Sequence, residues 1–219
     1  MKDNKTLFSK LKKHLSDNIV AAFGDGYIPD SSTASYNSTS SQEPDFTSPE
    51  EKQIIAGWDF PFEQLPHWEN LYRIAYSFNR AVENAESDTL CLLYAIAEPR
   101  MCFYAGFFAV LRCKEHPQLQ ALGSTAIQAD RQPIFSSDGR YIFIRMHRGV
   151  FVYDVSGRRY TLFVPETFGY HYNIEAITEL SASRFELLEE KTNKTCVLDI
   201  DSISWTEQEG TEIDTEFLG

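Results

Sequence analysis

With 219 residues, 42% of them hydrophobic and 14% aromatic, the chain has room for one domain with an appended segment and enough apolar area for a core. A formal net charge of −12 repels phosphate backbones, so we expect no nucleic-acid binding; the charge suits a basic partner or simple solubility. No apolar stretch of signal-peptide type follows the basic N-terminus, and the longest apolar run, 105–111, is too short for stable membrane insertion. The four cysteines form no C-x-x-C pair, which fits a reduced, cytoplasmic location.

The first two segments differ in composition. Residues 1–23 are expected to form an amphipathic helix, because apolar residues recur there at helical spacing: Phe8, Leu11, Leu15, Ile19 and Ala22. That helix would either lie on the domain or dock on a partner or a membrane surface. Residues 24–47 are rich in Ser, Thr, Asp and Pro, and we expect a flexible linker there.

Two further helices are expected before the chain turns to strands. The run Ser48-Pro49-Glu50-Glu51 combines a capping hydroxyl, a proline in the first turn and acids near the helix N-terminus, and so predicts a short helix through Ala56. A longer helix is expected over 66–85. Its apolar face would gather Trp68, Leu71, Ile74, Ala75, Phe78 and Val82.

From residue 89 onward, aromatic and β-branched runs separated by turn residues predict a β-rich region. The apolar runs 89–97 and 101–112 are expected to be central strands, and the polar stretch 114–125 a connection. The other strands are expected at 125–129, 133–135, 140–146, 150–155, 159–164, 174–180, 184–190, 195–200 and 202–205.

Two segments of this region share a pattern. SSDGRYIFIRMHRGVFVYDV (136–155) and LSASRFELLEEKTNKTCVLDI (180–200) each contain a turn, an aromatic-led strand, a second turn and an apolar-Asp-apolar end. A spacing of 44 to 45 residues resembles that of β-propeller repeats, because Tyr141 matches Phe185 and Asp154 matches Asp199. The β-rich region has room for about three such units, and a closed propeller needs at least about four.

We therefore expect an α+β fold, in which N-terminal helices pack on a twisted antiparallel β meander with propeller-like hairpin repeats that do not close into a propeller. The expected organisation is an amphipathic N-terminal helix (1–23), a flexible linker (24–47), a single α+β domain (48–206) and an acidic C-terminal tail (207–219).

No catalytic or metal-binding motif stands out. The sequence lacks H-E-x-x-H and G-x-S-x-G, and no two histidines are spaced as a helical ligand pair. We expect no cofactor, no metal and no catalytic residue. The enzymatic alternative is a hydrolase that uses scattered acids with His147 or His171.

A local basic cluster lies within the repeat region. It consists of Arg140, Arg145, Arg148, Arg158 and Arg159, interleaved with aromatic residues. The cluster would be either an anion-binding or single-strand-binding platform, or a solvent face whose arginines pair with nearby acids. The overall charge favours the second interpretation.

Two segments are candidates for partner binding. The acidic end has no Lys or Arg after position 201, and the aromatic loop 165–173 would supply interface anchors if exposed, or a plug at the sheet end if buried. The expected partner-binding residues are Phe168, Tyr170, His171, Tyr172, Trp205, Glu207, Glu209, Glu212, Asp214 and Glu216.

Together these features predict a cytoplasmic, non-enzymatic protein-binding module. The most concrete version is an immunity protein that inhibits a cognate bacterial toxin by occluding a basic active cleft. The alternatives are a scaffold or regulatory subunit of a larger assembly, or the hydrolase described above.

Overall fold

The computed structural model describes residues 48–61, 76–97, 104–127, 131–146, 149–168 and 173–213. The helix expected within 1–23 and the linker 24–47 lie outside the described residues. In chain order the elements are α2 (Pro49–Ala56), β1 (Tyr76–Asn84), β2 (Thr89–Ala97), β3 (Tyr104–Arg112), β4 (Gln118–Ile127), β5 (Ile134–Phe135), β6 (Tyr141–Met146), β7 (Gly149–Asp154), β8 (Arg159–Phe163), the 3-10 turn η2 (Glu166–Phe168), β9 (Ile174–Ser181), β10 (Arg184–Glu189), β11 (Thr195–Asp199), β12 (Thr206–Glu207) and β13 (Glu212–Ile213).

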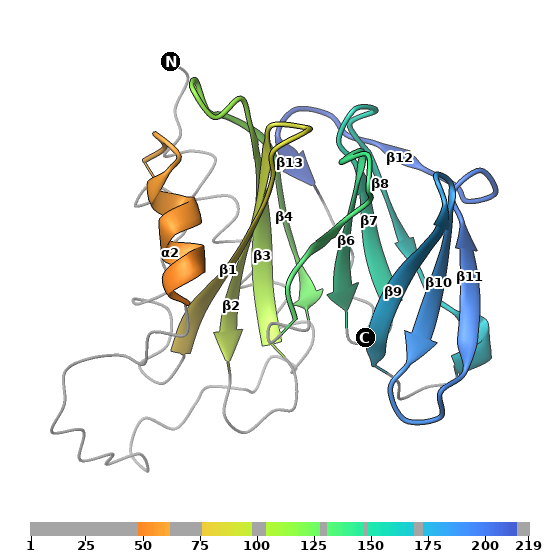
Figure 1. Ribbon diagram of the computed structural model, residues 1–219. Coiled ribbons are helices and arrows are strands. Elements are labelled where there is room, and N and C mark those ends of the chain that lie inside the picture. The colour runs from red at the N-terminus through yellow and green to blue at the C-terminus, as the bar shows by residue number, and fades with distance from the viewer. Residues whose placement is uncertain are drawn as a thin grey trace, which may run out of the picture.

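The strands form three stacked layers, which Figure 1 shows side by side. The first layer is the antiparallel meander β1-β2-β3-β4, the second is β5-β6-β7-β8, and the third is β11-β10-β9. The first two layers form one continuous sheet, and among the described residues the strand pairing that joins them is that of Ile127 in β4 with Met146 in β6. The sheet folds over at that pairing, so that its two halves lie face to face.

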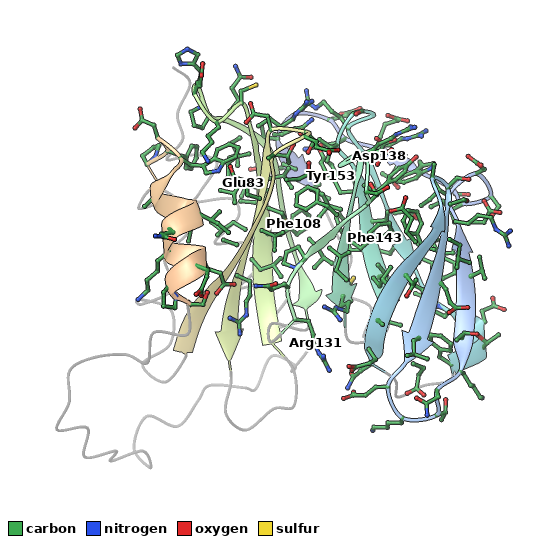
Figure 2. All side chains as sticks on the ribbon, in the orientation of Figure 1. Glu83, Phe108, Arg131, Asp138, Phe143 and Tyr153 are labelled. Carbon is green, nitrogen blue, oxygen red and sulfur yellow. The ribbon has the colours of Figure 1, made fainter. Side chains whose placement is uncertain are left out.

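The second layer is the centre of the molecule because it is buried on both faces. One face packs on the first layer, in a cluster that includes Cys91, Leu93, Phe108, Val110, Ala121, Ile142, Ile144, Met146, Phe151, Tyr153 and Val155. The other face packs on the third layer, in a cluster that includes Tyr141, Phe143, Val150, Val152, Ile174, Phe185, Leu187, Leu198 and Ile200. Figure 2 shows Phe108 and Tyr153 between the first two layers, and Phe143 toward the third.

This double burial explains why the sequence of β6 and β7 is apolar almost throughout. Successive side chains of a strand point to opposite faces, so a strand with one wet face alternates apolar and polar residues. Every residue of β7 is buried, as are all residues of β6 except Arg145, which is partly buried. The mid-chain aromatic stretch is therefore the central layer of a stack.

The expected α+β class with N-terminal helices packed on the sheet is wrong. Among the described residues 52% are strand and 9% helical, and α2 is the single α-helix. The error arose at 66–85, where residues 76–84 form β1 and pair with β2 along nine positions from Tyr76↔Ala97 to Asn84↔Thr89. The spacing of Phe78 and Val82 is compatible with a helix turn and equally with one face of a strand, and pairing with β2 selects the strand.

The helix expected after Ser48 is confirmed. The Ser48 hydroxyl accepts from the Glu51 N–H at 3.1 Å, while the Glu51 carboxylate accepts from the Ser48 N–H at 2.9 Å, which completes a capping box. Glu51 is buried and also accepts hydrogen bonds from Ala81 N–H and the Arg80 guanidinium of β1, both at 3.3 Å. These hydrogen bonds hold α2 against β1, which is the outermost described strand of the first layer.

Most strands after residue 89 lie where the sequence predicts them. The connection expected at 114–125 is wrong in its second part, because β4 begins at Gln118. Small and polar residues such as Gln118 and Gln120 give this segment no clear hydrophobic pattern, although it pairs with β3 along its length. The strand expected at 202–205 is displaced to β12.

The internal repeat corresponds to two hairpins, β6–β7 and β10–β11. Tyr141 and Phe185, which the sequence aligns, are both buried between the second and third layers, with ring centroids 6.3 Å apart. Asp154 pairs with Tyr141 across one hairpin, while Asp199 pairs with Arg184 across the other. The offset from Tyr141 to Phe185 is 44 residues and that from Asp154 to Asp199 is 45 residues. This difference of one residue corresponds to a shift of one residue in the strand register between the two hairpins.

Candidate functional site

The turns 85–88, 113–117, 136–140 and 155–158 lie at one edge of the stack, which we call the turn edge (Figure 1). The turns contact each other: the Cys113 N–H donates to the Asp88 carbonyl, and the Val155 N–H donates to that of Arg140. Gly139, with φ of 67°, approaches the β1–β2 turn so closely that a Cβ would lie 2.7 Å from Ser87. The turn edge is therefore closely packed.

A C-terminal strap, residues 205–213, runs along the turn edge from the third layer back to the first. Its β12 pairs antiparallel with β8 of the second layer, and its β13 pairs parallel with β4 of the first. Between them, the Tyr153 hydroxyl donates to Gln208 Oε1 at 2.6 Å, and Gln208 Nε2 donates to the Gln120 carbonyl at 2.9 Å. The strap is thus bonded to two layers.

The end of the strap contributes to the core. Ile213 is 2% exposed and belongs to the cluster between the first and second layers. Gly123 of β4 leaves the space for it, because a Cβ there would meet the Phe108 ring at 2.5 Å and the Ile213 side chain at 3.3 Å. Residues 207–213, expected to begin an acidic tail, therefore lie in the fold.

Asp154 is the buried charge of the turn edge. Its side chain is fully buried at the end of β7 and accepts from Arg140 Nη2 and Arg159 Nε, both at 3.1 Å, and from the Gly157 N–H at 2.9 Å. Burial acts to raise the pKa of this carboxyl, but the hydrogen bonds from Arg140, Gly157 and Arg159 outweigh it and hold the pKa below its usual value. Asp154 is therefore an anion that orders two arginines and a turn.

Each of the two arginines lies over an aromatic ring. Cζ of Arg159 is 4.6 Å from the centroid of the Trp205 ring, and Cζ of Arg140 is 4.9 Å from that of Tyr141. The rings of Tyr141 and Trp205 stack with centroids 6.2 Å apart and an interplanar angle of 19°. Tyr141 is buried and supports Trp205 from within the core, whereas Trp205 and the two guanidinium groups are partly exposed and form a rigid, accessible patch at the start of the strap.

The structure separates the residues expected to bind a partner. Phe168 is 8% exposed and packs between the second and third layers, so it acts as a core plug. Trp205 belongs to the patch above, Glu207 and Glu209 are exposed on the strap, and Glu212 is partly buried in β13. The other members, Tyr170, His171, Tyr172, Asp214 and Glu216, lie outside the described residues.

The basic cluster of the repeat is largely occupied by the protein itself. Arg140 and Arg159 bind Asp154, and the Arg158 guanidinium donates to the Gly210 carbonyl. Arg145 donates to the Glu175 carbonyl at 2.7 Å and to that of Gln132 at 3.3 Å. These contacts support the interpretation in which the arginines pair within the protein; Arg148 lies outside the described residues.

Asp154 aligns the repeat in the sequence and is one of the acids near the basic cluster, but sequence reasoning missed its central role. A usable signal was present, because Asp154 opens the turn DVSGR that is closed by Arg159, and Arg140 lies just before the strand that pairs with β7. A buried acid between two arginines in paired strands is a recognisable pattern for an ion-pair node.

In the parts of the chain that the structure describes, no three His, Cys, Asp or Glu side chains are grouped as metal ligands. No helix within these ranges is long and apolar enough to cross a membrane. A comparison with known protein families finds no match, and a comparison with curated proteins finds none either. The turn edge with its strap is thus defined by geometry alone as the candidate site.

Proposed function

We propose that this protein binds a second protein that presents a basic surface, and that it does so through the turn edge and the strap. The observation that carries the proposal is the position of Glu207 and Glu209, which are exposed on a strap paired with β8 rather than on a free chain. Charges held in place lose little conformational entropy on binding, and they steer an oppositely charged partner.

The neighbouring patch supplies the second element of a protein interface. Trp205 and the guanidinium groups of Arg140 and Arg159 are held in place by Asp154 and by the ring of Tyr141, which is buried beneath them. Trp, Tyr and Arg are the residue types that dominate binding energy at interfaces. The exposed acids of the strap would contact basic residues of the partner, and the Trp205 ring would fit into a hydrophobic depression on the partner's surface.

In its most concrete form, the proposal is that the chain is an immunity protein for a bacterial toxin. A basic catalytic cleft that binds phosphates would accept carboxylates in their place, and the protein would block the cleft by covering it. The net charge of −12 supports fast association with such a cleft.

The test compares two double variants with equal changes in charge. Glu207→Lys with Glu209→Lys changes the strap, and Glu50→Lys with Asp59→Lys changes exposed acids on and after α2; each pair shifts the net charge from −12 to −8. A partner captured by the wild-type chain is purified, and its association rate with each variant is measured over a salt series. We expect the strap variant to associate at least about tenfold more slowly and the control to change by less than about threefold.

The toxin form of the proposal has its own readout. The captured partner is assayed for catalytic activity, and a stoichiometric amount of the wild-type chain should abolish it while the strap variant inhibits weakly. Equal binding by both double variants would refute the assigned surface, and a partner whose activity is unaffected would refute the inhibitor role.

A further inference from the structure

The third layer is one strand short of the second. The repeat aligns β6 with β10 and β7 with β11, and the strands that precede them, β5 and β9, each pair with the first strand of their hairpin. In the second layer the chain returns after Asp154 to form β8 on the far side of β7. After Asp199 it instead leaves for Trp205 and pairs with β8, so within the described part of the chain β11 lacks the neighbour that β7 has.

The outer edge of β11 carries backbone groups that no strand of the described part of the chain pairs with. The Glu189 N–H donates to the Lys194 carbonyl, and the Ile200 N–H donates to the Ser183 carbonyl. In an antiparallel pair every second residue hydrogen-bonds to the partner strand, so the even-numbered residues from Lys194 to Ile200 face β10. Thr195, Val197 and Asp199 therefore direct their N–H and C=O groups away from β10. Among the described residues, the outward N–H and C=O groups of Thr195 and Val197 have one hydrogen-bond contact, a weak one from the Cys196 thiol to the Val197 carbonyl at 3.9 Å.

Among the described residues, three other strands have an edge that is covered at least in part. α2 lies on β1 through Glu51, β13 pairs with β4, and β12 pairs with β8. β11 has neither a proline nor a lysine among its residues TCVLD, and its central Val197 is 39% exposed. Proteins ordinarily protect such an edge, because it is a template for pairing with another strand.

We propose that β11 pairs antiparallel with β11 of a second copy, with Val197 on the two-fold axis. The Val197 residues of the two copies would exchange both hydrogen bonds, and each Asp199 N–H would donate to the Thr195 carbonyl of the other copy. The two third layers become one six-stranded sheet. This inference is independent of the proposed function, since it concerns a different edge and needs no other protein.

The charges along the edge favour a second copy in this orientation. Exposed Lys191 and Lys194 precede β11, whereas Asp199 and exposed Asp201 lie at and after its end. Antiparallel self-pairing brings the basic start of each strand to the acidic end of the other. This local match offsets the repulsion between two chains of net charge −12. Because the paired segment is short, we expect a dimer with Kd of roughly 1 to 100 μM.

The first test uses the direction of the Val197 N–H. Val197→Pro removes the donor that faces outward and leaves the hydrogen bonds to β10 in place, whereas Val197→Thr keeps the donor. Sedimentation velocity should show a concentration-dependent dimer for the wild type and V197T, and a monomer for V197P with unchanged circular dichroism. A wild-type chain that is monomeric to about 500 μM would overturn the proposal. If V197P unfolds, the charge variants below decide.

The second test depends on the register. Thr195 of one copy lies opposite Asp199 of the other, on the solvent face of the joined sheet. Thr195→Lys should therefore tighten the dimer, and Thr195→Glu should weaken it, each by roughly threefold to tenfold in Kd. The proposal would be overturned if Thr195→Glu gave the tighter complex and Thr195→Lys the weaker one, and if the protein bound a basic peptide but not itself. That result would assign the edge of β11 to a basic strand of another protein.

Discussion

At the scale of single residues, Asp154 shows how one buried charge can organise an edge of the molecule. It is fully buried, yet it touches two arginines that are partly exposed, with side-chain exposures of 44% and 30%. Those arginines lie in turn over Tyr141 and Trp205. Removing the charge should therefore affect both stability and the shape of the proposed binding patch.

We expect Asp154→Asn to lower the free energy of unfolding at pH 7 by about 1.5–3 kcal/mol, the usual contribution of hydrogen bonds to a charged group. Urea unfolding followed by fluorescence measures the change, and Asp59→Asn, at an exposed position after α2, is the control. A loss under about 0.5 kcal/mol, as at an ordinary surface site, would contradict the assigned role of Asp154.

The same variant predicts a pH dependence. Because the folded pKa of Asp154 lies below its usual value of 3.8, its contribution to stability is complete above that value and is lost as the pH falls through the folded pKa. The difference in stability between wild type and D154N should be constant from pH 7 to about pH 5 and should shrink below pH 4. If the difference in stability grew on acidification, the folded pKa of Asp154 would be raised rather than lowered, and the prediction would be wrong.

Residue-level features could be predicted only where the partner is close in sequence. The capping box at Ser48 and Glu51 was readable because both partners lie within one turn. The contact of Trp205 with Tyr141 was not, since it joins residues 64 positions apart through the path of the strap. For the same reason Trp205 could be proposed as a site residue without any account of its neighbours.

At the scale of elements, the strap differs most from what the sequence predicts. A run of acids without Lys or Arg is typical of a solvated tail. Here two short strands and Ile213 hold it; within its described part, Ile213 is buried in one core cluster and Trp205 packs against the other. An apolar residue isolated among acids has no period, so composition could not indicate it.

Ile213→Ala should destabilise the protein by about 2–4 kcal/mol, because it leaves a cavity between the first and second layers. Val164→Ala, at a side chain that is 43% exposed, is the control and should cost under about 0.5 kcal/mol. Equal midpoints of chemical denaturation for the two variants would mean that the end of the strap does not contribute to the fold.

The strand β1 shows the opposite limit of sequence analysis. Its apolar positions fit two periods, and the deciding factor is a hydrogen-bonded neighbour whose register spans nine residue pairs. The strands of the second layer were easier to predict, because β-branched and aromatic residues filled them and Gly-containing turns separated them. Which sides were buried depended on the stacking of layers, which no single segment encodes.

At the scale of the whole molecule, the central layer shares a core with each of its neighbours. β6 and β7 contribute to both clusters, so neither outer layer can separate without exposing one of their faces. We therefore expect the backbone amides of β6 and β7 to exchange with deuterium most slowly, at rates near those of global unfolding. Mass spectrometry of peptic peptides tests this, and equal or greater protection in β9–β11 would contradict it.

The strap also sets an order of events during synthesis. Gln208 binds the carbonyl of Gln120, 88 positions earlier, and β13 adds a strand to β4 after every other described strand has been made. While the ribosome is still translating the third layer, the space beside Gly123 has no Ile213 to fill it. A nascent chain stalled before residue 205 should therefore remain sensitive to protease in its first layer, and a chain in which residues 205–213 have left the ribosome should be resistant there.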